Sequence, residues 1–338
     1  MSVPRLLVTL IAATAMVVSV KVSKPVYAAP LDRAPRATHH IVSSVDRARL
    51  EATLGVLTGQ APTTSGVTIP ERGTTAGRLE TRTYLTAALT AIGYEVEAHD
   101  YRSNGQNILA RLPATVPTNE WILVGAHLDS VRNAGANDNG TGTACILEMA
   151  WVLRGLLDRR VNVLFVFFDE EERGLIGSYA LAAKFAQEKM SLTSVHTIDM
   201  MGWDADKDRA VEIEQPDGGL WEYYNAANAR HGLGLKLVRT SSGATDHVAF
   251  RESGFRSVGL CEEWVGGDTT PYYHRKSDTF ATVDLDYLTS TTRLFTAVVV
   301  DLVSQVPAPE KQPFDPHESF PGRDHCGHGD GETLPLPD

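Results

Sequence analysis

Histidine and acidic side chains gather in four short segments of the sequence. Three of these segments directly follow apolar runs rich in Val, Ile and Phe, which are typical of buried strands. The fourth is a loop that precedes a predicted helix. Because ligands of open α/β sheets bind beyond the carboxyl ends of the strands, we expect all four segments to meet at one edge of a sheet. In chain order they are His127 to Asp129, Asn137 to Gly142, Asp169 to Glu172, and Asp199 with Met200.

Carboxylates crowded into one crevice repel each other unless a cation neutralises them or some are protonated. A mixed set of His and carboxylate ligands suits Zn²⁺, and several carboxylates allow two ions to share one of them. Two ions about 3.5–4 Å apart are a common device for activating water and stabilising a tetrahedral intermediate. The residue types therefore favour a metal centre that can activate water.

Each segment also has an ordinary structural interpretation when it is taken alone. Asn137-Asp138-Asn139-Gly140 is typical of a turn followed by a helix N-cap, and the acidic run 169–172 could be a solvated loop. A His-x-Asp pair is more often a hydrogen-bonded pair than a metal ligand with its support. The joint occurrence of these segments after successive strands is what favours the metal centre.

Short apolar runs alternate with helical patterns along the chain. The expected strands are 108–112, 121–126, 161–168, 195–198 and 257–260. The expected helices are 45–57, 78–92, 141–157, 178–188 and 285–303. This alternation predicts an α/β three-layer sandwich, with a mixed, mostly parallel central sheet and helices on both faces.

Composition excludes several classes of protein. The chain has 338 residues, of which 43% are hydrophobic and 22% charged, and this excludes a disordered, collagen-like or coiled-coil chain. The net charge is -11 and there is no basic run, so nucleic-acid binding is not expected. Three Cys residues are too few for a disulfide framework.

The N-terminus predicts export. Arg5 is followed by the apolar run 6–20 and by small residues that end in Ala28-Ala29, which indicates a secretory signal peptide over residues 1–28. Fifteen apolar residues are short for a membrane span, although Lys21 and Lys24 leave an uncleaved anchor open. We therefore expect a secreted or periplasmic protein without stable membrane association.

Six motifs, in this order, resemble peptidase family M28, the co-catalytic zinc peptidases of the aminopeptidase Y and bacterial leucyl aminopeptidase type. The resemblance covers about residues 78–304. The motifs are Gly125 to Ser130, Ala136 to Gly142, Glu171 to Ser178, Ile198 to Gly202, Thr245 to Phe250, and Tyr273 to Thr279. Each motif is weak by itself, and the ordered set carries the resemblance.

The resemblance implies two Zn²⁺ ions per chain and the five residues that would hold them. His127 and Asp199 would hold one ion, Glu172 and His274 would hold the other, and Asp138 would bridge both. It also implies a cis peptide bond directly after the bridging Asp.

Four further residues are expected to act on the reaction or to support the ligands. The resemblance makes Glu171 the general base for a water shared by the two ions, and leaves Glu170 as an extra acid. Asp129 would orient the His127 ring, as metal-bound His commonly requires, and Asp246 would support the site. Tyr273, next to a ligand, would either donate a hydrogen bond to the oxyanion or pack beside the metal.

Composition and the resemblance together indicate how the chain is organised and what it does. Residues 29–44 would be an unstructured lead or short pro-segment, 45–306 a single zinc peptidase domain, and 307–338 a disordered tail rich in Pro, Gly and His. The function implied is a secreted zinc-dependent exopeptidase, an aminopeptidase that acts on peptides or proteins. Three alternatives stay open: a single-zinc enzyme like glutaminyl cyclase, a carboxypeptidase of the same family, and an inactive binding ectodomain.

Two acidic residues that follow an expected strand are candidates for binding the substrate. A free α-ammonium is a cation, and Glu262 and Glu263 follow the expected strand 257–260. We expect Glu263 to bind the substrate ammonium, with a pair of solvated loop acids as the alternative.

Overall fold

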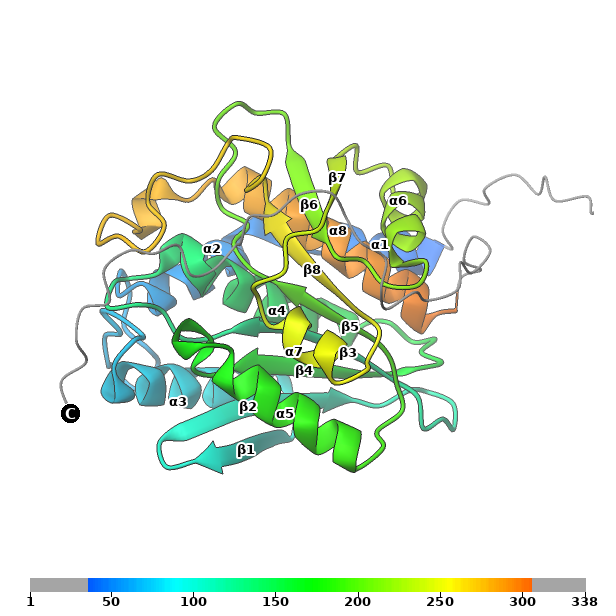
Figure 1. Cartoon of the computed structure of the whole chain (residues 1–338), viewed down its shortest axis with the longest axis horizontal. Helices are drawn as coiled ribbons and strands as arrows, with labels where there is room; N and C mark the ends of the chain where they lie inside the picture. The colour runs from blue at the N-terminus through cyan, green and yellow to red at the C-terminus, as the bar shows by residue number, and fades with distance from the viewer. Residues whose placement is uncertain (1–35, 306–338) are drawn as a thin grey trace, which may run out of the picture. The chain divides into compact units, whose positions relative to one another are not determined.

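A mixed sheet of eight strands runs through the computed structural model, which describes residues 36–305 (Figure 1). All of these residues belong to one compact unit of the chain. The strands are β1 (Val96–Arg102), β2 (Gly105–Leu112), β3 (Trp121–His127), β4 (Asn162–Phe168), β5 (Leu192–Ile198), β6 (Ala210–Glu214), β7 (Lys236–Thr240) and β8 (Ser257–Glu262). Their order in the sheet is β1-β2-β4-β3-β5-β8-β6-β7.

The four central strands are parallel. β4, β3, β5 and β8 pair in parallel, whereas β2 joins β4, and β6 joins β8, in antiparallel pairs. The carboxyl ends of the central strands therefore meet at one edge of the sheet. That edge holds the acidic and His segments discussed above.

Helices cover both faces of the sheet, as the alternating side chains of β4 demonstrate. Val163, Phe165 and Phe167 belong to one buried core, and Leu164, Val166 and Phe168 belong to the other. The helices against the first core are α1 (Arg36–Ser43), α2 (Arg47–Leu57), α3 (Thr75–Ile92), α4 (Gly142–Leu153), α6 (Leu220–Arg230) and α8 (Leu285–Val303). Those against the second are α5 (Ile176–Gln187) and α7 (His247–Glu252). Helix, sheet and helix thus form the three layers that the sequence predicts.

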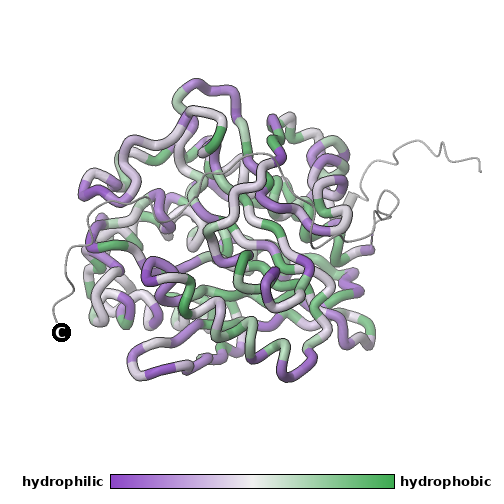
Figure 2. Tube along the Cα trace, viewed as in Figure 1, coloured by the Kyte–Doolittle hydropathy of each residue, from purple (hydrophilic) through white to green (hydrophobic). Residues whose placement is uncertain are grey.

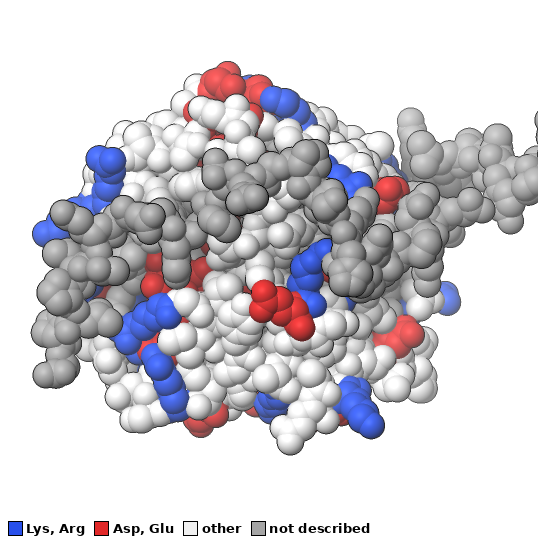
Figure 3. Space-filling view, in the orientation of Figure 1, with Lys and Arg blue, Asp and Glu red and all other residues white. Residues whose placement is uncertain are grey.

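Hydropathy follows this layering. Every residue of β4 is buried, so a strand covered on both faces needs a continuous apolar sequence. Apolar segments concentrate on the central strands, and hydrophilic segments on the outer loops (Figure 2). On the face drawn in Figure 3, Lys and Arg side chains are scattered in small groups, and acidic groups lie between them.

The helix at residues 36–43 corrects one expectation. Residues 29–44 are expected to form an unstructured lead, but α1 occupies half of that range and packs against α8. Ile41 and Val42 are buried in the first core, and this burial stabilises a helix that is weak by itself. The expected signal peptide, 1–28, and the expected tail, 307–338, lie outside the described residues.

The other expected strands and helices are present, with ends that differ by a few residues. The structure adds β1, β6, β7, α6 and α7, which the sequence analysis did not predict. No helix within residues 36–305 combines the length and apolar character that crossing a membrane requires.

Candidate metal centre

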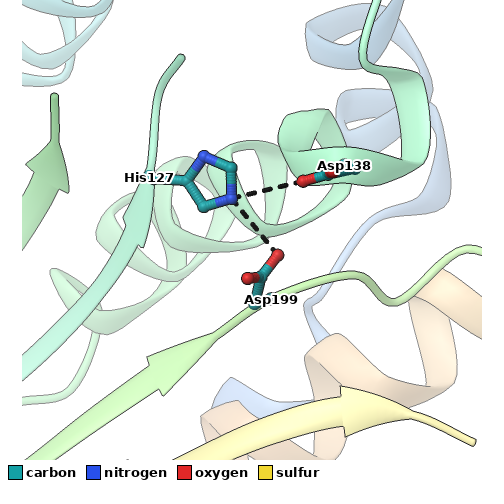
Figure 4. A group of neighbouring side chains, drawn as sticks. All are labelled: His127, Asp138 and Asp199. Carbon is teal, nitrogen blue, oxygen red and sulfur yellow. Dashed lines mark hydrogen bonds and ion pairs between the residues drawn. The ribbon is translucent and has the colours of Figure 1, made fainter. Parts of the chain in front are cut away.

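Three side chains from separate segments converge at the end of β3. The His127 ring points toward two carboxylates, one from the loop before α4 and one from the end of β5 (Figure 4). Its Nε2 lies 3.3 Å from Asp138 Oδ1 and 3.2 Å from Asp199 Oδ1. These three residues could together hold one metal ion.

A second group of three shares Asp138 with the first. His274 Nε2 lies 3.2 Å from Asp138 Oδ2 and 3.0 Å from Glu172 Oε2. The two oxygens of Asp138 therefore face different imidazoles, and each group could hold an ion. The structure brings all five expected ligands together, and the peptide bond Asp138–Asn139 is cis, as the resemblance implies.

Backbone contacts fix the loop that carries Asp138. The carboxylate of Asp278 accepts hydrogen bonds from the backbone N–H of Asn137 at 2.8 Å and of Asp138 at 3.1 Å. The Asn139 side chain donates to the carbonyl oxygen of Ile198 and accepts from Gly142 N–H. This loop is therefore tied both to the segment after His274 and to the end of β5.

Asp129 contacts both the first group and the Glu171-Glu172 pair. Its Oδ1 lies 3.4 Å from His127 Nδ1 and accepts a hydrogen bond from Glu171 N–H at 3.1 Å. Its Oδ2 accepts from Glu172 N–H at 3.4 Å. Glu171 itself is buried, and its Oε2 lies 3.9 Å from His127 Nε2. The expected base thus faces the first group while its backbone is held by Asp129.

Burial and crowding shift the pKa values at this centre. Burial raises the pKa of Glu172 to about 7, and the charge of Asp138 adds to the rise. Burial also raises the pKa of Glu171 well above its usual range, with help from the Asp199 charge. Burial opposes protonation of His274, but its contacts with Asp138 and Glu172 outweigh this and raise its pKa to about 10. Carboxylates placed this closely favour protonation unless a cation neutralises them.

The donor set fits zinc. Each group offers one imidazole nitrogen and two carboxylate oxygens, and Zn²⁺ accepts both kinds of ligand. Three protein ligands per ion leave a position for water or substrate, as in catalytic rather than structural zinc sites. The shared carboxylate would let two ions lie side by side.

Two other expected residues lie near the centre. Tyr273 stacks on the His274 ring, with the ring centroids 3.8 Å apart, and also contacts the edge of Trp264. Burial raises the pKa of Tyr273, and the Asp138 charge adds to this effect. Burial raises the pKa of Asp246 to about 7, although the nearby His127 charge opposes the shift. Tyr273 thus lies against the ring of an expected ligand, and the supporting role of Asp246 stays a prediction.

Glu263 is not part of either group of ligands, and its role in substrate binding stays a prediction. Among the described residues, Glu263 groups with Asp206 and Asp208 instead of the expected ligands. β8 runs two residues further than expected, to Glu262, which is buried. It is Glu262 that accepts a hydrogen bond from the Asn137 side chain, at 2.9 Å.

Two supporting residues escaped the sequence analysis. Asp278 lies inside the last of the six motifs, four positions after His274. Its place beside an expected ligand could have marked it as a supporting residue. Arg72 lies in a stretch rich in Thr, Gly and Pro, where no local pattern marks it. Its fully buried guanidinium donates to the backbone carbonyls of Leu57, Leu128, Ala134 and Gly135.

Comparison with known proteins agrees with this geometry. A sequence model described as Peptidase family M28 matches residues 107–299. The chain is 31% identical over 217 residues to aminopeptidase YwaD of Bacillus subtilis, which covers 62% of this chain and 46% of that protein. The chain spans about half the length of the curated relatives it matches.

Solved structures with the same fold include two aminopeptidases. BSAP, a zinc aminopeptidase from Bacillus subtilis, has a TM-score of 0.54 and 28% identity, over 59% of this chain and 50% of its own. The LapA aminopeptidase of Legionella pneumophila has a TM-score of 0.68 and 20% identity, over 80% of this chain and 75% of its own. The second likeness concerns the fold alone.

Proposed function

Because the chain belongs to peptidase family M28, we propose that it is a zinc-dependent aminopeptidase that removes N-terminal residues from peptides. The observation that carries the proposal is the pair of three-residue groups that share Asp138, with Glu171 beside them. The names of its relatives point the same way, since YwaD and BSAP are both called aminopeptidases.

Zinc in these groups would supply a Lewis acid that polarises the scissile carbonyl and lowers the pKa of an attacking water. His127, Asp138 and Asp199 would hold one ion, and Asp138, Glu172 and His274 the other. The carboxylate of Glu171 would accept the proton of the attacking water and pass it to the leaving amine. Asp129 would keep Glu171 in place through its hydrogen bond to the Glu171 N–H.

The two complete groups argue against two of the three alternatives. A single-zinc centre would need only one group, whereas both groups are complete in the structure. An inactive binding ectodomain would not be expected to retain five ligands and a base. A carboxypeptidase of the same family would use the same centre. An assay that shows whether residues are released from the N-terminus or from the C-terminus of a peptide distinguishes the two activities.

We also propose that the protein is exported, on the basis of its N-terminal sequence. The apolar run 6–20 followed by small residues supports a secreted or periplasmic protein. Peptides or proteins outside the cytoplasm would then be its substrates. The acidic net charge argues against nucleic acid as a partner.

Metal analysis joined to an activity assay tests the proposal. The full chain is stripped with a chelator, dialysed, and titrated with Zn²⁺ while hydrolysis of an aminoacyl-nitroanilide is followed. We expect no hydrolysis in the stripped protein and full recovery as zinc approaches two ions per chain. Full activity at one ion per chain, or in the stripped protein, would contradict the two-ion proposal.

A further inference from the structure

Glu170 is an acidic residue that the proposed reaction does not use. It directly precedes the proposed base, and it is buried. Its backbone has φ 64° and ψ 35°, the left-handed region that glycine adopts far more readily than other residues. A non-glycine residue keeps this conformation only where its surroundings hold it, and such positions cluster at functional sites.

Four donors hold the Glu170 carboxylate. Its Oε1 lies 3.0 Å from Arg78 Nη2 and 3.2 Å from Arg173 Nη1. Its Oε2 lies 2.7 Å from Arg102 Nε and accepts a hydrogen bond from the Tyr101 hydroxyl at 3.1 Å. Each oxygen therefore has two partners, and the side chain has little freedom to turn.

The preceding residue, Asp169, is held in the same way. Its carboxylate lies 2.8 Å from Arg78 Nε and 2.5 Å from Arg82 Nη1, and both arginines are buried. We call Arg78, Arg82 and Arg102 the arginine clamp. These residues come from α3 and β1, which precede the segment 107–299 that matches the family.

The arginine clamp and Asp129 bind opposite ends of the segment 169–172. Asp169 and Glu170 are fixed by the arginines, and the N–H groups of Glu171 and Glu172 donate to Asp129. We propose that the arginine clamp is a positioning device, which holds Glu170 in the left-handed conformation and thereby directs the Glu171 carboxylate into the centre. This inference rests on the proposed function for Glu171.

The ion pairs of the clamp are better explained by the placement of Glu171 than by the stability of the fold. Desolvation of the charges offsets much of their attraction, so such pairs are weak evidence of stabilisation. A reacting group displaced by about 1 Å, in contrast, can slow an enzyme on the order of 10²-fold. A rigid cluster behind the base is therefore best explained as a means of placing it.

Two substitutions at Glu170 weaken or remove its contacts with the clamp. Glu170→Gln keeps the size and removes the charge, whereas Glu170→Gly suits the positive φ and removes the side chain. We expect both variants to lower kcat roughly 10–100-fold, since Gln weakens the contacts with the clamp and a glycine without those contacts adopts other backbone conformations besides the left-handed one. KM should stay within about two-fold, because substrate contacts are unchanged. Wild-type kcat in Glu170→Gly would overturn the proposal.

A double-mutant cycle tests whether Arg102 acts through Glu170. The Arg102 side chain is 43% exposed, so Arg102→Gln should fold. We expect this variant to lower kcat roughly 3–10-fold, Arg102→Lys to restore part of the loss, and Arg102→Gln to add nothing to Glu170→Gln. Fully additive losses would overturn the proposal.

Arg111→Gln is the matched control. Arg111 lies on β2 and pairs with Glu97 at 2.9 Å, with its side chain 38% exposed. This variant also removes a partly exposed arginine, but one that does not contact Glu170, so kcat should not change. A loss equal to that of Arg102→Gln would overturn the proposal, since any surface arginine would then suffice.

Amide hydrogen exchange supplies a readout independent of activity. We expect exchange in residues 169–175 to be roughly 10-fold faster in Glu170→Gly than in wild type, with no change in Arg111→Gln. Unchanged exchange in Glu170→Gly would overturn the clamp even if activity fell. If the wild type hydrolyses no aminoacyl substrate, the proposed function fails, and exchange still decides whether the clamp orders the Glu171 segment.

Discussion

Asp138 and Glu171 have similar chemistry but different surroundings. Asp138 lies between two imidazoles, and these outweigh the effect of burial and lower its pKa. Glu171 has one imidazole within 3.9 Å, and burial raises its pKa well above the usual range. A carboxylate that stays ionised suits a shared ligand, and one that takes up protons readily suits a base.

Glu171→Gln tests this division of roles. The substitution removes the proton acceptor and leaves all five ligands, so kcat should fall roughly 10²–10⁴-fold. Zinc content, measured by atomic emission on the same sample, should stay at the wild-type level. Loss of both ions with the activity would make Glu171 a ligand and shift the assignment by one residue.

Asp278→Asn tests the support of the bridging residue. An amide can still accept from one N–H of the Asn137-Asp138 segment, but it loses the charge and one acceptor oxygen. We expect the affinity for zinc to fall about 10–100-fold in competition with a chelator. Asp286→Asn is the control, since that side chain is 87% exposed, and an equal fall there would refute the role of Asp278.

At the scale of elements, the ends of strands were predictable where an apolar run was followed directly by an acidic or His motif. Apolar runs gave β3, β4 and β5 to within a few residues, because strands buried on both faces must be continuously apolar. The ends of these strands then placed His127, Glu172 and Asp199 at one edge of the sheet. The close approach of these residues follows from parallel pairing, which the alternation of elements already indicates.

Errors arose where distant contacts decide the structure. The sequence gives no sign that β8 continues to Glu262, and a difference of two residues decides which acid reaches Asn137. β1 was missed because none of its residues is buried and few are apolar. The partners of Arg72 are carbonyl groups up to 63 residues away, which no local pattern reveals.

The helix α1 gives a test at this scale. Ile41 is 6% exposed and packs in the first core, so Ile41→Ala should lower the free energy of unfolding by about 2–5 kcal/mol. His40→Ala, at an exposed position of the same helix, should change it by less than about 0.5 kcal/mol. Urea denaturation measures both. If both substitutions changed the free energy of unfolding by a negligible amount, the packing of α1 would not contribute to stability.

Across the whole molecule, metal binding and stability should be linked. A ligand that binds only the folded state stabilises it by about 2.7 kcal/mol at 100 times its Kd. The centre draws on segments from β3 to the loop after β8, so zinc should stabilise the described fold as a unit.

Thermal unfolding with and without Zn²⁺ measures this linkage. We expect a clear rise in Tm with zinc, and little change with Mg²⁺, which prefers oxygen ligands. Asp138→Asn removes the ligand shared by both groups and should abolish most of the rise. A zinc-dependent rise of wild-type size in Asp138→Asn would place the ion elsewhere.

The central claim is that this centre acts on peptides with a free N-terminus. A free α-ammonium is a cation that a carboxylate beyond the five zinc ligands can bind, and acetylation removes its charge and leaves that carboxylate unpaired. The most direct measurement compares kcat/KM for a peptide and for its N-acetylated form on the zinc-loaded chain. We predict a value at least about 10²-fold lower for the acetylated peptide. Equal cleavage of the two peptides would contradict an aminopeptidase.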